Sequence, residues 1–372
     1  MGDSRVRGPP RPALVGLLVF GTYARSVFLT YVGCLLEVLM RIVGPIAYLL
    51  AVLCWPASAE ESKEAVMTVR PVHTFSIVAR DPETGQMGVA VQSHWFSVGS
   101  VVSWAEAGVG AVATQSLVDP SYGPLALDLL RAGKSPEDAL KGLLTADSGS
   151  DVRQVGIVDS QGRVAVHTGA RCIPEAGHHA GKGYTTEANL MERNTVWDAM
   201  ANAYEHATGP FADRLIAALE AGQREKGDIR GKQSAAILIV AAKATGRPWE
   251  DRIMDLRVED SPDPIKELKR LVKVHQAYQH MNAGDAAMEK NDVAGAQREY
   301  GAAEAMSPEN EEMVFWHAVA LANAGKVDES LPLFHKVFKK NANWAVLAPR
   351  LVPIKLLNVS EADLNRITKQ SR

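Results

Sequence analysis

The chain has 372 residues, of which 47% are hydrophobic and 22% are charged, and its formal net charge is -3. This is the composition of a globular protein long enough for two domains, and the small negative charge excludes a field that attracts nucleic acid or anionic membranes. No stretch interleaves basic and aromatic residues, so we expect no nucleic-acid partner. With only Cys34, Cys54 and Cys172, a disulfide framework and a cysteine-rich metal site are excluded as well.

The N-terminal region 13–55 is strongly apolar but is interrupted by charged residues. From Met40 onward, a positive charge, an apolar run and an Ala-Ser-Ala sequence follow in the order of a secretory signal peptide. We therefore expect translation to start at Met40, so that residues 1–39 are a mis-assigned upstream extension. Residues 40–59 are then expected to be a cleaved signal peptide. The mature protein would then be periplasmic or extracellular. The alternative is a retained N-terminal membrane anchor, although neither apolar run reaches the roughly 20 residues that a span needs.

Short apolar runs separated by turn residues predict paired strands from Phe75 onward. Two hairpins are expected, one around the Asp81–Gly85 turn and one around Ser160-Gln161-Gly162. Because the runs are apolar throughout, both faces of the sheets should be covered. The predicted strands are 75–79, 88–92, 109–115, 154–159, 163–169 and 234–240.

The helices are expected between these strands. One helix should end at Gly133, and the next should begin after Ser135, whose hydroxyl can accept from a free amide of the first turn. Two longer helices are expected near 190–207 and 210–224. Hairpins with helices grouped between them predict an α+β fold, a four-layer αββα sandwich over residues 73–262, after a linker at 60–72.

Beyond Pro262 and Pro264 the pattern becomes helical and repeats with a period of 34 residues. Small residues in the repeat allow two helices to approach closely, and an aromatic residue fills the space between them. The pairs related by this period are Gly284 and Ala318, Val293 and Val327, Ala296 and Ser330, and Tyr300 and Phe334.

Residues 263–345 therefore resemble tetratricopeptide repeats, complete in the first copy and degraded in the second. The alternative is two generic amphipathic helix pairs. Repeats of this kind usually bind peptides or stack against a neighbour, so a peptide, protein or cell-wall partner is expected here. Residues 346–372 are expected to form a C-terminal tail.

Several types of chemistry have no motif in this chain. Gly108-Val109-Gly110 lacks the further glycine of a phosphate-binding loop, and there is no nucleophile elbow. The adjacent pair His178 and His179 has no carboxylate at ligand spacing, so we interpret it as part of a surface loop. We expect neither a metal nor another cofactor.

Five motifs follow one another between Thr74 and Ala236. They are Thr-Phe-Ser-Ile-Val-Ala from Thr74, Gly-Val-Ala-Val-Gln-Ser from Gly88, Trp-Ala-Glu-Ala-Gly-Val-Gly-Ala from Trp104, Ala-Thr-Gln from Ala113, and Gly-Asp-Ile-Arg-Gly-Lys-Gln-Ser-Ala-Ala from Gly227. Together they make His73–Val240 resemble a bacterial family known as domain of unknown function 1028, placed in the N-terminal-nucleophile hydrolase superfamily. Family members with an appended C-terminal module, sometimes suggested to bind peptidoglycan, look similar to this layout.

The resemblance implies a mechanism in which the hydroxyl or thiol of the first residue attacks an amide carbonyl and its own α-amine accepts the proton. Thr74 matches that first position. In this chain His73 precedes it, so the amine is part of a peptide bond. Either the His73–Thr74 bond is cut, or Thr74 is only a β-branched strand residue.

Further site residues are expected near the ends of the neighbouring strands. Ser93 and His94 are candidate catalytic partners, and alternation along a strand means that only one of them should face the site. Asp228 and Arg230 alternatively pair with each other to order a loop, and Glu106 alternatively is a solvated turn residue. The candidate substrate-binding residues are Gln92, Thr114, Gln115, Glu106, Asp228, Arg230 and Gln233.

The leading functional hypothesis is an exported amidohydrolase that cleaves a small amide or peptide bond with Thr74 as nucleophile. The alternative is a non-catalytic periplasmic protein that binds a peptide or peptidoglycan. A homo-oligomer is compatible with either hypothesis.

Overall fold

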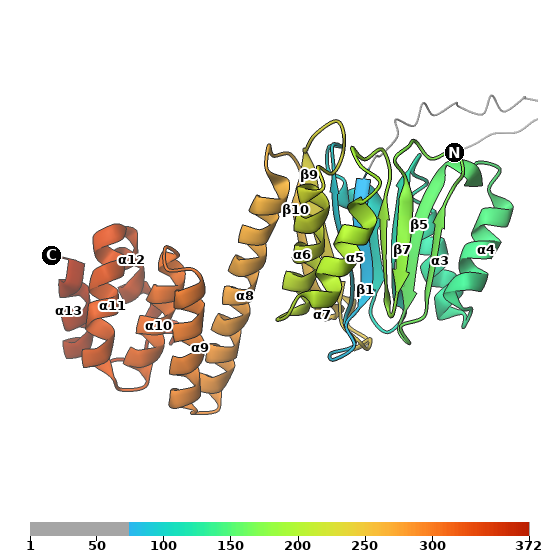
Figure 1. Cartoon of the computed structure of the whole chain (residues 1–372). Coiled ribbons are helices and arrows are strands. Elements are labelled where there is room, and N and C mark those ends of the chain that lie inside the picture. Colours follow the sequence, from blue (N-terminus) through green and yellow to red (C-terminus); the bar gives the residue numbers. More distant parts are fainter. Residues whose placement is uncertain (1–73, 372) are drawn as a thin grey trace, which may run out of the picture. The chain divides into compact units, whose positions relative to one another are not determined.

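The computed structural model describes residues 74–371, which form a mixed α and β structure with two antiparallel sheets followed by a series of helices (Figure 1). The expected upstream extension, signal peptide and linker lie outside the described residues. Within residues 74–371, no helix is both long and apolar enough to span a membrane.

The larger sheet has six strands in the order β10-β9-β2-β1-β8-β7, and the smaller has four in the order β3-β4-β5-β6. The strands of the larger sheet are β1 (Thr74–Arg80), β2 (Met87–Ser93), β7 (Gly177–Gly181), β8 (Tyr184–Ala188), β9 (Ser234–Val240) and β10 (Arg252–Val258). Those of the smaller sheet are β3 (Ser103–Glu106), β4 (Gly110–Ser116), β5 (Arg153–Asp159) and β6 (Val164–Thr168). The first strand of the fold, β1, is thus paired on both sides, with β2 and β8.

The two sheets contact each other through small apolar side chains. On β1 and β2, Val78 and Val91 point toward the smaller sheet, where they share a core with Ala111 and Ala113 of β4. Alternation along β1 directs Phe75 and the residues in phase with it to the opposite face. There they pack against helices α5 (Val196–His206) and α6 (Phe211–Arg224) and the first half of α8 (Pro264–Glu289).

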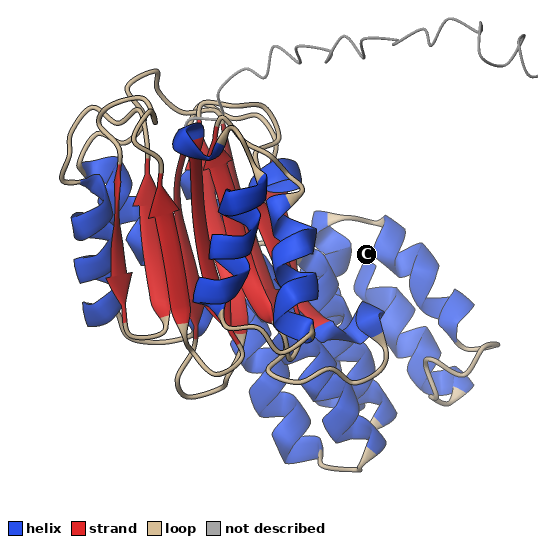
Figure 2. Cartoon of the chain, turned by 90° about the vertical axis from the view of Figure 1, so that its right-hand side faces the viewer, coloured by secondary structure: helices blue, strands red, loops and turns tan. Residues whose placement is uncertain are grey.

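The outer face of the smaller sheet packs against α3 (Tyr122–Arg131) and α4 (Pro136–Ala146), and Figure 2 shows the strands lying between helices. The predicted start of α4 is confirmed, because the Ser135 hydroxyl accepts a hydrogen bond of 3.1 Å from the Asp138 amide. The remaining elements between Thr74 and Val258 are α2 (Gly99–Val102), η1 (Ser150–Val152) and α7 (Pro248–Asp251).

The helical region begins within α8 and continues to the end of the described chain. Gly284 of α8 lies directly under Tyr300 of α9, and a Cβ atom at Gly284 would come within 2.5 Å of that ring. The expected pairing of a small residue with an aromatic ring therefore occurs between α8 and α9. The other helices are α9 (Val293–Met306), α10 (Glu311–Asn323), α11 (Val327–Lys340), α12 (Asn343–Leu347), η2 (Ala348–Leu351), α13 (Glu361–Thr368) and η3 (Lys369–Ser371).

The segment expected to be a tail is folded. Leu351, Leu357 and Ile367 are buried against Phe338 and its neighbours in the core of the last helices. Their side chains close the end of the helical stack, so the helical region extends past the expected boundary at 345.

A buried candidate active site between the sheets

Thr74 is the first residue of β1 and has no exposed surface. Its Oγ1 donates a hydrogen bond of 3.2 Å to the Ser93 hydroxyl at the end of β2. Its carbonyl oxygen accepts from the backbone amide of Asn189 at 3.1 Å, and from the side-chain amides of Asn189 and Gln115 at 3.4 Å each. Thr74 is thus held at both its hydroxyl and its carbonyl group.

Polar residues replace apolar ones at this end of the core between the sheets. Ser76 and Thr74 follow the same alternation as Val78 on β1, and Ser93 follows that of Val91 on β2. From the facing sheet, Gln115 follows Ala113 on β4 into the same space. The space between the sheets is therefore apolar along most of its length and polar where Thr74 lies.

Gln154 on β5 connects the two sheets. Its Nε2 donates to the carbonyl oxygens of Gly177 at 3.1 Å and Ala188 at 2.9 Å. Its Oε1 accepts from Gln115 Nε2 at 2.7 Å and from Asn189 Nδ2 at 2.9 Å. Gln154 and Asn189 were not predicted as site residues, although a glutamine at the start of an apolar strand such as QVGIVD was a signal that could have identified the first.

A buried carboxyl group, Glu187 of β8, lies next to this network. Its Oε2 is 2.9 Å from Ser76 Oγ, which is also 2.7 Å from Gln115 Oε1. Burial raises the pKa of Glu187 to about 7. Gly156 of the facing strand makes room for it, because a Cβ there would lie 1.9 Å from Glu187 Oε1. Glu187 was not among the predicted residues either.

Of the two predicted catalytic partners, the structure brings only Ser93 to Thr74. The amide of His94 donates to the Asp228 carboxylate at 3.0 Å, and that carboxylate also accepts from the Arg230 guanidinium at 2.7 Å. Asp228 has no exposed side-chain surface. The pair formed by Asp228 and Arg230 therefore anchors its own loop to the end of β2, which agrees with the structural alternative for these residues.

Two predicted substrate-binding residues, Gln92 and Thr114, point away from the space between the two sheets. Gln92 lies opposite Phe75 in the register of β1 and β2, and so faces the helices rather than the smaller sheet. Thr114 faces outward from β4 and donates to the Asp119 carbonyl at 3.1 Å, whereas Gln115 faces inward. As adjacent residues of one strand, Thr114 and Gln115 point to opposite faces, and only Gln115 reaches the space around Thr74.

The side chains of two others point away from Thr74, although the backbone amide of Gln233 donates to the Ser93 carbonyl at 3.1 Å. Glu106 is paired with Gly110 at the far end of β4 and forms a surface ion pair with Arg131. The Gln233 side chain donates to Asp260 at 3.2 Å on the exposed side of its loop. Neither side chain contacts the network around Thr74 in the described structure.

A depression of about 590 Å³ borders the network on the side of β6 and β7. Thr168 borders both the network and the depression, because its hydroxyl lies 2.8 Å from Gln154 Nε2 and 2.8 Å from His178 Nδ1. Burial lowers the pKa of His178. The residues that line the depression include Thr168, Cys172, Glu175, His178 and Trp197.

The two adjacent histidines lie on strand β7, not in a surface loop as expected. His178 binds Thr168, whereas His179 contacts Asp198 of α5 at 2.9 Å on the other face of the strand. Alternation along the strand separates the two rings and explains why they do not act together.

Comparison with known proteins places most of this region in one family. The model of the family of unknown function DUF1028 matches residues 74–268. A solved structure of a DUF1028 protein from Silicibacter pomeroyi is 32% identical, with a TM-score of 0.49 over 58% of this chain and 89% of that one. The Anbu (ancestral beta-subunit) protein from Yersinia bercovieri is 10% identical, with a TM-score of 0.29 over 53% of this chain and 92% of that one. No match was found among curated proteins.

Proposed function

The chain belongs to the family of unknown function DUF1028, and we propose that it is an exported amide hydrolase with the Thr74 hydroxyl as nucleophile. In this proposal the two sheets and their outer helices form the αββα sandwich of the N-terminal-nucleophile type. The observation that carries the proposal is the position of Thr74. It starts the central strand β1, its hydroxyl contacts Ser93, and its carbonyl accepts from Asn189 and Gln115.

The chemistry requires that the bond between His73 and Thr74 is cut. Cleavage releases an α-amine, whose ordinary pKa near 8 suits a general base at neutral pH. The amine removes the proton from Oγ1, which attacks the carbonyl carbon of an amide and gives a tetrahedral oxyanion. The Ser93 hydroxyl lies within reach of a group bound at Oγ1 and is the proposed donor to that oxyanion.

Collapse of the tetrahedral intermediate expels the amine product, which takes the proton from the α-ammonium group, and leaves an ester on Oγ1. Water activated by the same α-amine then hydrolyses the ester and restores Thr74. The depression beside Thr168 and His178 is the proposed approach for a small amide or peptide substrate.

The test combines the N-terminus of the exported protein with substitutions at Thr74. We expect mass spectrometry to show a mature chain that begins at Thr74, and hydrolysis of an amide library that survives Thr74→Ser but falls by at least about 10³-fold in Thr74→Ala. Thr195→Ala, at an exposed threonine before α5, is the control and should retain activity. A fully active exported chain that still begins at Glu60 would contradict the free-amine mechanism.

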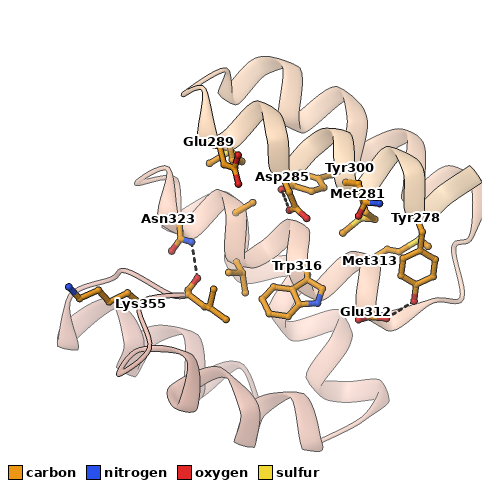
Figure 3. Close-up of a pocket in the computed structure, with 15 residues that line it drawn as sticks. Tyr278, Met281, Asp285, Glu289, Tyr300, Glu312, Met313, Trp316, Asn323 and Lys355 are labelled. Atoms are coloured by element: carbon orange, nitrogen blue, oxygen red, sulfur yellow. Dashed lines mark hydrogen bonds between the residues drawn. The ribbon is translucent and has the colours of Figure 1, made fainter. Parts of the chain in front are cut away.

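A second candidate function, peptide binding by the helical region, is favoured by a groove of about 550 Å³ between α8, α10 and the segment around Lys355 (Figure 3). Met288, Trp316 and Leu356 supply apolar surface, and Asp285 and Glu289 lie along the same groove. We propose that these helices are tetratricopeptide-like repeats whose groove takes an extended peptide with apolar and basic side chains.

The binding proposal is tested with a fluorescently labelled peptide of alternating leucine and lysine residues. Binding should be lost in Trp316→Ala and retained in Thr74→Ala, and a peptide with glutamate in place of lysine should bind at least about tenfold more weakly. Equal binding of the two peptides would contradict recognition by the acidic side chains.

A further inference from the structure

The hydrogen bonds around Thr74 determine which atoms carry protons. The assignment starts from the side-chain amide of Gln154. Its Nε2 faces the carbonyl oxygens of Gly177 and Ala188, and carbonyl oxygens only accept. The opposite orientation of the amide would place its oxygen against both carbonyls. Gln154 Oε1 is therefore the atom that faces Gln115 and Asn189.

The orientation of Gln115 follows from that of Gln154. The Gln115 atom at 2.7 Å from Gln154 Oε1 must be a donor, and the same atom also faces the Thr74 carbonyl. It is therefore Nε2, and the other end of the amide, Oε1, must accept. Its partner is the Ser76 hydroxyl at 2.7 Å.

Ser76 has one proton and two oxygen neighbours. A hydroxyl donates once, so a proton that goes to Gln115 Oε1 is not available to Glu187 Oε2 at 2.9 Å. If Glu187 were ionised, Ser76 Oγ and Glu187 Oε2 would lie at hydrogen-bond distance with no proton between them. A protonated Glu187 donates to Ser76 and satisfies both contacts.

We infer that Glu187 is a neutral carboxylic acid and acts as a positioning residue for Thr74. Its proton leaves the Ser76 hydroxyl free to donate to Gln115 Oε1, and this bond together with that of Nε2 to Gln154 holds Gln115 toward the Thr74 carbonyl. This role rests on the proposed function only insofar as Thr74 is the nucleophile, whereas the protonation state does not depend on it.

Burial is the largest influence on Glu187 and raises its pKa, whereas its contacts with Thr185 and Ser76 act in the opposite direction. Ser76 faces it from β1, Gly156 from β5, and Thr185 lies on the same face of β8. The titratable group beside it is His178, its partner in the register of β7 and β8, whose pKa is itself lowered by burial. Among the described residues no cation forms an ion pair with Glu187, and burial disfavours its charge.

Ionisation of Glu187 would reverse the hydrogen bond between Glu187 and Ser76. The Ser76 proton would turn to the carboxylate, and Gln115 Oε1 would lose its donor inside a buried space. Gln115 would then be held toward the Thr74 carbonyl at its Nε2 end alone, by Gln154. Hydrolysis should therefore decline as the pH rises through the pKa of Glu187, although the α-amine of Thr74 becomes a better base over the same range.

The experiment compares the wild type with Glu187→Gln, whose side-chain amide donates to Ser76 at every pH. Glu192→Gln, at an exposed glutamate shortly after β8, is the matched control. At about pH 6, where an exposed glutamate is ionised, the infrared difference spectrum should show a protonated-carboxyl C=O stretch in the wild type and Glu192→Gln that Glu187→Gln lacks.

Two further readouts use the same proteins. The unfolding constant of the wild type relative to Glu187→Gln should rise by about tenfold between pH 6 and pH 9. The reason is that burial raises the pKa of Glu187 in the folded protein, so that the folded state releases this proton at a higher pH than the unfolded chain does. Hydrolysis by the wild type should decline above about pH 7, and Glu187→Gln should keep its activity there.

A carboxylate instead of a carboxylic acid at pH 6, or a stability difference that does not change with pH, would overturn the inference. So would an identical decline of hydrolysis with pH in wild type and Glu187→Gln. Failure of the proposed function has a different signature, because absence of hydrolysis leaves the infrared band and the unfolding profile intact.

Discussion

Single residues between the sheets have little freedom to change, and Gly156 illustrates the reason. It stands on β5 opposite Glu187, and the carboxyl group occupies the volume that any side chain at this position would need. Ser76, Gln115 and Gln154 are each bonded to two or more partners in the same space. The polar network depends on the shape of the opposite strand as much as on its own residues.

Replacement of Gly156 by alanine tests this packing. Because the new Cβ would overlap Glu187 Oε1, we expect a loss of about 1–3 kcal/mol in the free energy of unfolding, measured by urea denaturation. Gly142→Ala in α4 is the control, since no atom lies within 4 Å of the position that its Cβ would take, and it should be neutral or stabilising. Equal effects of the two substitutions would mean that β5 and β8 move apart to accept the new Cβ atom without a loss in the free energy of unfolding.

At the scale of elements, the strands with a continuous apolar run were predicted from the sequence, and strands without such a run were missed. The six predicted runs correspond to β1, β2, β4, β5, β6 and β9. The missed strands include β7 and β8, whose sequences GHHAG and YTTEA have neither an apolar run nor a regular alternation. They form strands because β8 pairs with β1 and is buried there. This pairing joins residues that are far apart in the sequence.

The loop between α6 and β9 gives a prediction at this scale. Asp228 accepts from the amides of His94 and Arg230 while fully buried, so Asp228→Ala should lower the free energy of unfolding by about 2–3 kcal/mol. Arg230→Ala should cost less, because its guanidinium is partly exposed. Thermal unfolding measures both. If Asp228→Ala raised KM at unchanged stability, the residue would instead contact the substrate.

At the scale of the whole molecule, α8 belongs to two cores. Ile265, Leu268 and Val272 in its first half are buried against the larger sheet and α6, whereas Met281 and Gly284 pack in the first helix pair. The expected boundary at 262 therefore lies before a helix that completes the sheet region. The family match, which ends at residue 268, also reaches into this helix.

Leu268→Ala tests this assignment in the full chain. It removes a fully buried side chain from the core of the larger sheet, so we expect a loss of about 2–5 kcal/mol and faster hydrogen exchange in β9 and α6. Leu356→Ala, at a side chain that is 49% exposed, should change neither. Faster exchange confined to α10 and α11 would show that the residue belongs to the helical region alone.

What the sequence by itself determined was local: the apolar strands, the helix that begins after Ser135, the resemblance that singled out Thr74, and the 34-residue spacing of Gly284 and Ala318. Each depends on residues close together in the chain or on a fixed repeat. The tertiary structure decided which side chains meet: it joined Thr74 to Ser93, Asn189 and Gln115, and turned Gln92 and Thr114 away. It also brought Glu187 to Ser76, which is 111 residues away in sequence. Such contacts follow from strand order and register, which depend on the burial of the whole sheet and not on any local pattern.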